Sequence, residues 1–469
     1  MRTESLKKCK ALLITLLTAA GTIHLIIAAF RYVIRLAPLK KYEYIGAAVI
    51  FTGALICLIL SFTRGGRDVR RFRTFISGMM SYEQIFMLLF TGWSAVSFLV
   101  NRSISRPGFT HHNEWYLFDV FVNAALLFPL AKILTERNAR RVINAMMLLV
   151  LLPYSAFTIY GLRQVLSLNF IKLPSGSNLM MRQSTTGLQL GSHYNITGMQ
   201  ALLMLVLCLY FLASGRKKLR FLLLPLIPVQ LFAANISNSR TVFVTGLIVI
   251  PLYLFLYIIN RRAGHISRKY LAAAVCAAAA AFTLYYFSRP LSFYLFEKIS
   301  GYSQQVIGSG DGVGTTMGNI RKLNNLSGRV PIWKSCLKAM LHDPVTFFFG
   351  VTPSCITQAL TDIGGYPLKA DHAHNMVLQT GMSAGVPAML AYCVFLVSVC
   401  RRCLGVLFSS IRVKGDTGWQ IPVLILSLTV PCLVEYYISS YHVMAGLFSL
   451  LAGLVLLMNT RQAAETRSA

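Results

Sequence analysis

The sequence predicts an all-α protein that crosses a membrane about twelve times, and three observations support this fold class. Hydrophobic residues make up 55% of the 469 residues, charged residues only 13%, and the mean hydropathy is +0.61. Such a composition leaves too little polar surface for a soluble protein of this length. The apolar residues form runs of about 20, the length that an α-helix needs to span a bilayer. The basic residues lie in short segments between these runs, as in membrane proteins whose loops determine topology.

The candidate spans follow one another through short loops, except for a long gap before the tenth. The first begins after the charged sequence MRTESLKKCK and lacks a clear small-residue cleavage site, so we interpret it as an uncleaved span. The twelve cover approximately residues 11–30, 44–62, 78–100, 116–134, 142–162, 197–213, 220–236, 240–260, 270–287, 375–399, 418–437 and 440–458. We therefore expect nine spans in residues 1–287, a large loop in residues 288–374 and three spans in residues 375–469.

The basic residues predict that both termini lie in the cytoplasm. In this orientation more than half of the 45 Lys and Arg residues fall inside, in segments such as RGGRDVRRFR and GRKKLR, although the first outer loop (residues 31–43) is also basic. The loop 288–374 is then outside the cytoplasm, where ATP is absent. Its sequence GSGDGVGTTMG lacks the ending of a nucleotide-binding P-loop and is expected to be a flexible connection. The net charge of +30 is accounted for by topology, and no nucleic-acid-binding motif accompanies it.

The large loop contains a predicted amphipathic helix that we expect to lie on the outer membrane surface. In SGRVPIWKSCLKAMLHDP, Pro331 suits the first turn, and His342-Asp343-Pro344 ends the pattern. Lys334 and Lys338 form the polar side, and the apolar side is formed by Ile332, Trp333, Cys336, Leu337, Met340 and Leu341. Cys336 and Cys355 share this loop and could pair, whereas the C-x-x-C at Cys400 and Cys403 is weak evidence for metal or redox chemistry.

Three polar residues are expected at helix N-termini on the external side. Arg240 begins the eighth span, Arg329 precedes the amphipathic helix, and His374 precedes the tenth span. A helix N-terminus offers free N–H groups and a partial positive charge, and arginine adds a planar fork that matches phosphate oxygens. A histidine can take a proton from an attacking hydroxyl near neutral pH. Together they predict a site for a lipid-linked phosphate or diphosphate beside an acceptor alcohol.

Each of these residues also has a simpler interpretation. A lone interfacial arginine often reaches toward lipid headgroups, and Asp371 or Asn375 could merely cap a helix beside a bystander His374. Asp371, His372 and His374 could instead bind a metal, although an H-x-H without further spaced ligands is weak evidence and we predict no metal. A serine hydrolase using Ser237 or Ser239 lacks a G-x-S-x-G context.

Four sequence elements resemble the bacterial O-antigen ligase and O-antigen polymerase family. They are SNSRT at 237–241, SGRVPIW at 327–333 followed by Gly350, and an H-N-x9-G element from His374 to Gly385, with RQSTTGLQLGSHYN at 182–195 as a weaker match. The resemblance covers roughly residues 180–440. It implies catalytic roles for His374, Arg240 and Arg329, and substrate binding by Arg182, His193, Asn195, Ser239 and Asn375. The segment 182–195 could equally be a polar loop folded back on itself.

The resemblance implies a metal-independent, inverting glycosyltransferase related to the integral-membrane GT-C fold, without a cofactor. Its donor would be a glycan on undecaprenyl diphosphate, its acceptor the hydroxyl of a glycan or lipid-glycan, and it would act at the outer face of the plasma membrane. Many ligases carry a second glycine where this chain has Ala388, so ligase and polymerase both remain open. The alternative class is a transporter or flippase of lipid-linked oligosaccharides, which would place charged residues deep within several spans. Glu83, Asp119 and Glu435 instead lie close to span ends.

Overall fold

The computed structural model describes residues 19, 21–23, 25–26, 81–133, 136–166, 171–172, 178–179, 181–184, 187–190, 194–213, 217–261, 268–300, 329–367, 370–436 and 443–468. The first two expected spans lie largely outside these residues. The longer described helices are α4 (Tyr82–Ser103), α5 (His112–Ile133), α6 (Glu136–Leu166), α7 (Tyr194–Ala213), α9 (Leu226–Ile236), α10 (Arg240–Arg261), α11 (Arg268–Ser300), α13 (Arg329–Met340), α17 (Val386–Arg412), α18 (Gln420–Thr429) and α19 (Val443–Ser468).

Shorter elements connect these helices. They are α8 (Lys217–Leu223), α14 (Pro344–Phe349), the 3-10 turn η3 (Pro353–Cys355), α15 (Ile356–Gln358), the π-turn η4 (Ala359–Ile363), α16 (Met376–Ala384) and the 3-10 turn η5 (Val430–Leu433). Two antiparallel strand pairs join β1 (Ile171–Lys172) to β2 (Asn178–Leu179) and β3 (Met181–Ser184) to β4 (Gly187–Leu190). The described chain is otherwise helical, as the sequence predicts for a polytopic membrane protein.

Seven described helices are long and apolar enough to cross a membrane: Tyr82–Ser103, Ala139–Leu166, Tyr194–Ala213, Leu219–Ile236, Arg240–Arg261, Arg268–Phe296 and Val386–Arg412. Shorter apolar helices cover Gln420–Leu433 and Met444–Met458. The predicted eighth span agrees closely with α10. The predicted ninth span is too short, because α11 continues through Pro290 to Ser300.

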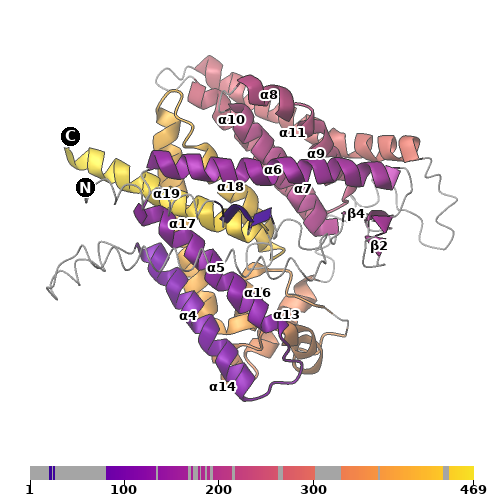
Figure 1. The fold of residues 1–469 in the computed structure, drawn as a ribbon, viewed down its shortest axis with the longest axis vertical. Helices are drawn as coiled ribbons and strands as arrows, with labels where there is room; N and C mark the ends of the chain where they lie inside the picture. Colours follow the sequence, from indigo (N-terminus) through magenta and orange to yellow (C-terminus); the bar gives the residue numbers. More distant parts are fainter. Residues whose placement is uncertain are drawn as a thin grey trace.

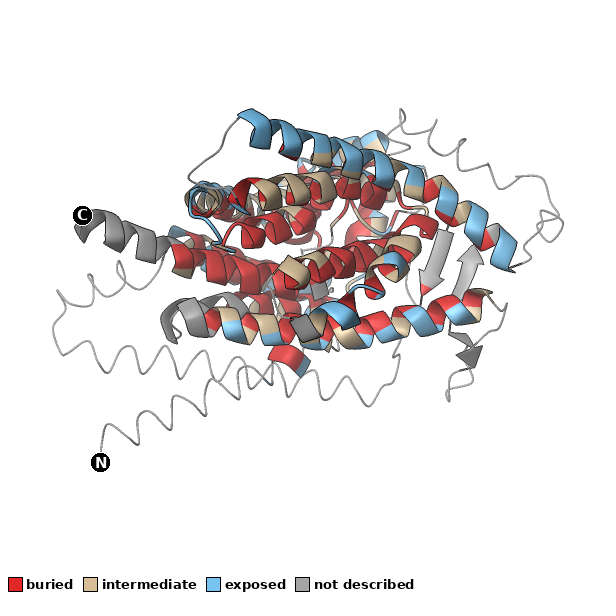
Figure 2. Ribbon diagram, turned by 90° about the horizontal axis from the view of Figure 1, so that it is seen from above, coloured by how far each residue is buried: buried red, intermediate tan, exposed pale blue. Residues whose placement is uncertain are grey.

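The helices form two groups that meet at α18 and α19 (Figure 1). In one group α4 packs against α5 and α17, and in the other α7, α9, α10 and α11 pack side by side, with α6 beside α7 and α9. Buried residues are concentrated in the central helices, whereas the outer helices expose much of their surface (Figure 2). Trp419, at the start of α18, packs tilted against Tyr253 of α10, with 5.0 Å between ring centroids. The apolar core therefore continues between the groups.

A second, smaller core lies beneath α13. The amphipathic helix forms, but its buried face is Ile332, Ser335, Cys336, Ala339 and Met340, while Leu337 and Leu341 are exposed. The prediction of the apolar side was thus partly wrong, because small side chains allow α13 to pack closely against η4 and α16. Cys336 and Cys355 are both buried in this core as free cysteines, and burial raises the pKa of the Cys336 thiol to about 12.

Two glycines allow the small core to pack closely against the helices of the membrane bundle. The predicted tenth span is interrupted at Gly385, where φ is +88° and α16 ends before α17 begins. A side chain at Gly385 would overlap the carbonyl oxygen of Phe348, and one at Gly350 would lie 2.6 Å from the carbonyl oxygen of Met382. Beside this crossing, the N–H of Val351 donates to the Met382 carbonyl at 2.7 Å. The two glycines therefore permit a backbone contact that holds α14 against the break in the span.

Candidate active site

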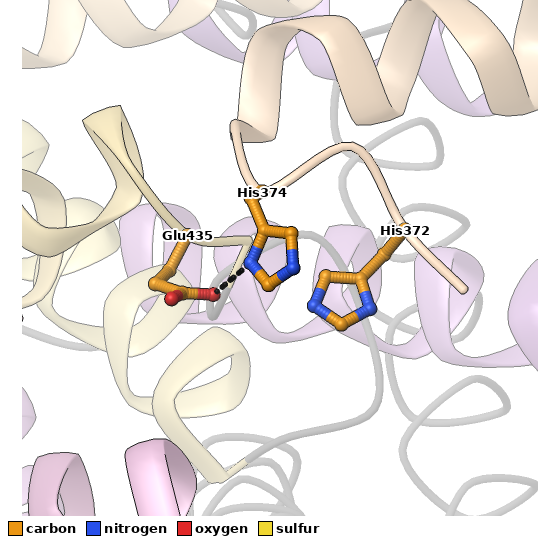
Figure 3. A group of neighbouring side chains, drawn as sticks. All are labelled: His372, His374 and Glu435. Carbon is orange, nitrogen blue, oxygen red and sulfur yellow. Dashed lines mark hydrogen bonds and ion pairs between the residues drawn. The ribbon is translucent and has the colours of Figure 1, made fainter. Parts of the chain in front are cut away.

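One buried carboxylate gathers the predicted site residues. Glu435, 2% exposed, follows η5 and accepts a hydrogen bond from Arg329 Nη2 to Oε1 at 2.6 Å. Asn195 Nδ2 donates to the same oxygen at 3.0 Å. The second oxygen, Oε2, lies 3.1 Å from Nδ1 of His374 (Figure 3). Both oxygens of Glu435 are therefore engaged by residues that the sequence proposes as functional.

The partners of Glu435 come from the N-terminal ends of separate helices. Asn195 is the second residue of α7, Arg329 begins α13, and His374 stands two residues before α16. Arg329 Nη2 also lies 3.4 Å from the hydroxyl of Thr241 in the first turn of α10, the helix that Arg240 begins. Free N–H groups and the positive ends of four helix dipoles are thus directed toward one region. Such a region favours an anionic ligand.

His374 is held by its backbone as well as by its ring. It has φ +48°, a left-handed conformation that is unusual for a residue with a side chain. The next residue, Asn375, caps α16 by accepting from the N–H of Leu378 at 3.0 Å, and its amide donates to the carbonyl of Leu433 at 2.9 Å. The cap therefore joins α16 to the segment that carries Glu435. This is the capping role that the sequence allowed for Asn375, and contact of Asn375 with a substrate stays a prediction.

The hydrogen bond to Glu435 defines what the imidazole can do. A carboxylate can only accept, so Nδ1 of His374 carries the shared proton, and Nε2 is left as the basic atom. A carboxylate that orients a histidine in this manner is the arrangement found where histidine acts as a general base. The pairing with Arg329 also supplies the positive charge that a buried carboxylate requires.

The turn before Arg240 is packed tightly. Ser237, fully buried, lies so close to α7 that a side chain on Gly198 would overlap its hydroxyl. Ser239 caps α10, its hydroxyl accepting from the N–H of Val242 at 3.4 Å. Ser239 is itself buried, so the observed role of its hydroxyl is to support the start of α10. Arg240 is half-buried beside it.

The remaining predicted residues lie on the segment before α7. Arg182 belongs to β3, which pairs antiparallel with β4, as the alternative interpretation of a segment folded back on itself expects. The position of the Arg182 side chain and all of His193 lie outside the part of the chain that the structure describes. Their roles in substrate binding stay predictions.

The structure groups a different set of potential metal ligands from the one that the sequence suggested. Asp371 accepts a hydrogen bond from the hydroxyl of Thr357 at 3.2 Å and does not join the histidines. Instead His372, His374 and Glu435 bring three potential ligand atoms within 4.8 Å of one another, and Figure 3 shows the imidazoles side by side. Zinc accepts such ligands. However, Arg329 and His374 already use the Glu435 carboxylate, and an ion there would lie close to a guanidinium. We therefore derive no chemical step through a metal.

Glu435 is the main residue that the sequence did not predict for this site. It stands at the end of an apolar segment, 106 positions from Arg329 and 61 from His374. No motif spacing connects it to either residue. The signal that could have found it is its rarity, because the chain has only 15 acidic residues and this one lies in an apolar segment.

Comparison with known families agrees with the motifs. A family model described as O-antigen ligase matches residues 226–393, a range that includes Arg240, Arg329, Gly350, His374 and Gly385. Asn195 and Glu435 lie outside it. Among curated proteins, no match was found. The family implies a membrane glycosyltransferase of the O-antigen ligase or polymerase type. Residues 226–393 of the chain are thus similar to the O-antigen ligase family.

Proposed function

We propose that the protein transfers a glycan from an undecaprenyl-diphosphate carrier to an acceptor hydroxyl at the outer face of the bacterial plasma membrane. The observation that carries this proposal is the contact of one carboxylate, Glu435, with both Arg329 and His374. It brings a group suited to phosphate and a group suited to proton transfer into one site. The reaction is an inverting displacement, with no metal ion required.

In this mechanism, Arg240 and Arg329 bind the diphosphate, and the dipoles of the surrounding helices add to their attraction. Nε2 of His374 takes the proton of the acceptor hydroxyl as its oxygen attacks the anomeric carbon. The bond from that carbon to the diphosphate breaks, and the diphosphate leaves with the bonding electron pair. Attack opposite the leaving group inverts the anomeric configuration. The two arginines stabilise the charge that develops on the leaving group.

Reconstitution with a purified undecaprenyl-diphosphate glycan tests these roles. We expect His374→Ala, Arg240→Ala and Arg329→Ala each to abolish measurable transfer while inserting into the membrane at normal levels. His111→Ala and Arg102→Ala are matched controls, because both residues are exposed, Arg102 pairs with Glu114 and His111 stacks on His112. Full transfer by the His374 variant would remove that residue from the mechanism. Transfer that is lost with chelator and restored by a divalent metal would contradict the metal-independent reaction.

The glycans of a deletion strain separate the two possible reactions of the family. Single repeat units attached to the acceptor would indicate a lost polymerase. Long chains that remain on the carrier would indicate a lost ligase. A transporter would instead leave the lipid-linked glycan on the cytoplasmic leaflet, and the purified protein would not catalyse transfer.

A further inference from the structure

Arg289 is a buried arginine that the proposed mechanism does not use. It lies in α11 and is only 1% exposed. Its Nη2 donates to Oδ1 of Asn238 at 2.6 Å, and its guanidinium carbon stands 4.7 Å from the centroid of the Phe243 ring. Asn238 is in the left-handed conformation, with φ +58°, in the short turn before α10. Arg289 therefore holds the turn that leads directly to Arg240.

The charge of Arg289 is not balanced by the described part of the protein. Its Nε and Nη1 have no hydrogen-bond partner there, and none of the described carboxylates lies within ion-pair distance. Burial of a cation without an anion is unfavourable, and buried charges are normally paired. We therefore expect an anionic ligand to pair with Arg289 during binding or catalysis.

The location of Arg289 indicates which anion this is. Arg289 binds Asn238, which stands two residues before Arg240, so its positive charge lies near that of Arg240. The N-terminus of α10 and Arg329 lie on the same side of the bundle, since Arg329 contacts Thr241. A second positive charge near Arg240 adds little to the binding of a neutral sugar, but it attracts a ligand with more than one negative charge. The diphosphate of a lipid carrier has that property, and a monophosphate has it to a lesser extent.

We propose that Arg289 is a positioning residue of the carrier site, which fixes the turn before Arg240 and supplies a buried positive charge that favours a lipid diphosphate over a lipid monophosphate. This inference rests on the proposed function, because it assigns the anion to the glycan donor. It extends the site to α11, a helix that carries none of the predicted site residues.

The experiment measures binding of undecaprenyl diphosphate and undecaprenyl monophosphate, both without sugar, to the full-length protein in lipid nanodiscs. We expect the wild-type protein to prefer the diphosphate. Arg289→Met should reduce this preference about tenfold, because a full charge is lost in a medium of low dielectric constant. Arg289→Lys keeps the charge and should keep most of the preference. Arg102→Met, which changes an exposed arginine, should leave it unchanged.

Asn238→Asp separates charge from folding. It places a carboxylate where the amide now accepts from Arg289, so the buried cation gains a counter-ion and the turn is held at least as firmly. Aspartate also tolerates the left-handed conformation. We expect an unchanged or higher melting temperature together with loss of the diphosphate preference. A purely structural role for Arg289 predicts the opposite, a stable variant that binds both lipids as the wild type does.

The outcomes distinguish this inference from the function on which it rests. If the wild-type protein transfers glycan and both Arg289→Met and Asn238→Asp keep the diphosphate preference, the role of Arg289 is wrong and the function stands. If the wild-type protein neither transfers glycan nor prefers the diphosphate, the proposed function itself fails.

Discussion

At the scale of single residues, the site depends on one carboxylate that binds two basic side chains. Arg329 and His374 are separated by 45 positions in the chain, and the Glu435 carboxylate is what brings their side chains to a common point. Sequence reasoning identified the arginine and the histidine because each belongs to a short motif at the start of a helix. It placed Glu435 near the end of a span without assigning it a role, and it did not single out Arg289.

Glu435→Gln should lower the rate of glycan transfer by about 10²–10⁴-fold, the usual contribution of general base catalysis. The amide is similar in size but removes the negative charge that fixes the proton on Nδ1 of His374 and balances Arg329. The measurement is kcat with the reconstituted protein and saturating donor. Glu435→Asp keeps the charge on a shorter side chain, so its kcat should lie between those of the wild-type protein and the glutamine variant. A glutamine variant with the wild-type rate would mean that His374 acts without the carboxylate.

At the scale of elements, the motif glycines explain how short helices are held in place. Gly350 and Gly385 belong to the motifs that resemble the family, but in the structure they contact backbone and not the site residues. Their part is to let α14 cross the break between α16 and α17. Hydropathy predicted a continuous span at 375–399, because the residues on both sides of Gly385 are apolar. The break depends on a contact with residues 348–350, which no local pattern contains.

Gly385→Ala should destabilise the protein by roughly 2–4 kcal/mol, because a methyl group would meet the Phe348 carbonyl and because φ is positive there. Thermal unfolding in detergent measures this effect, and transfer activity should fall with it, since His374 lies just before α16. Gly405→Ala in α17 is the matched control, because a side chain at that position meets nothing within 4 Å. Equal melting temperatures for the two variants would contradict the proposed crossing.

The bounds of long apolar helices followed from the sequence, whereas interruptions and extensions did not. Span 240–260 matches α10 because its ends carry arginines and its interior is uniformly apolar. The predicted ninth span stops at residue 287 because Ser288-Arg289-Pro290 interrupts the apolar run there, although a helix can continue past it. In the structure Pro290 lies inside the helix, and the Arg289 side chain is turned inward to Asn238.

At the scale of the whole molecule, two helix groups bring distant segments to one end of the bundle. Asn195 and Glu435, 240 positions apart, meet there. The basic residues predict the orientation of the chain, and this orientation places the site at the outer face of the membrane. Sequence could predict which helix ends lie on the same side, but only the packing of α18 and η5 determines which of these ends come into contact.

Cysteine labelling tests the orientation directly. Lys338→Cys in α13 and Lys414→Cys after α17 both replace exposed lysines. With a membrane-impermeant maleimide, the first should be labelled in intact cells once any outer envelope layer is opened. The second should be labelled only after the plasma membrane is permeabilised. The wild-type protein gives the background from its native thiols. The reverse pattern would place the site in the cytoplasm and contradict the proposed reaction at the outer face.

The shared carboxylate has a consequence for the order of events in the catalytic cycle. Glu435 divides its negative charge between Arg329 and His374. When a phosphate oxygen draws Arg329 away, more of that charge is available to hold the proton on Nδ1 of His374. The imidazole would therefore be held most firmly once the glycan donor is bound, and arrival of the first substrate would itself prepare the protein to activate the second.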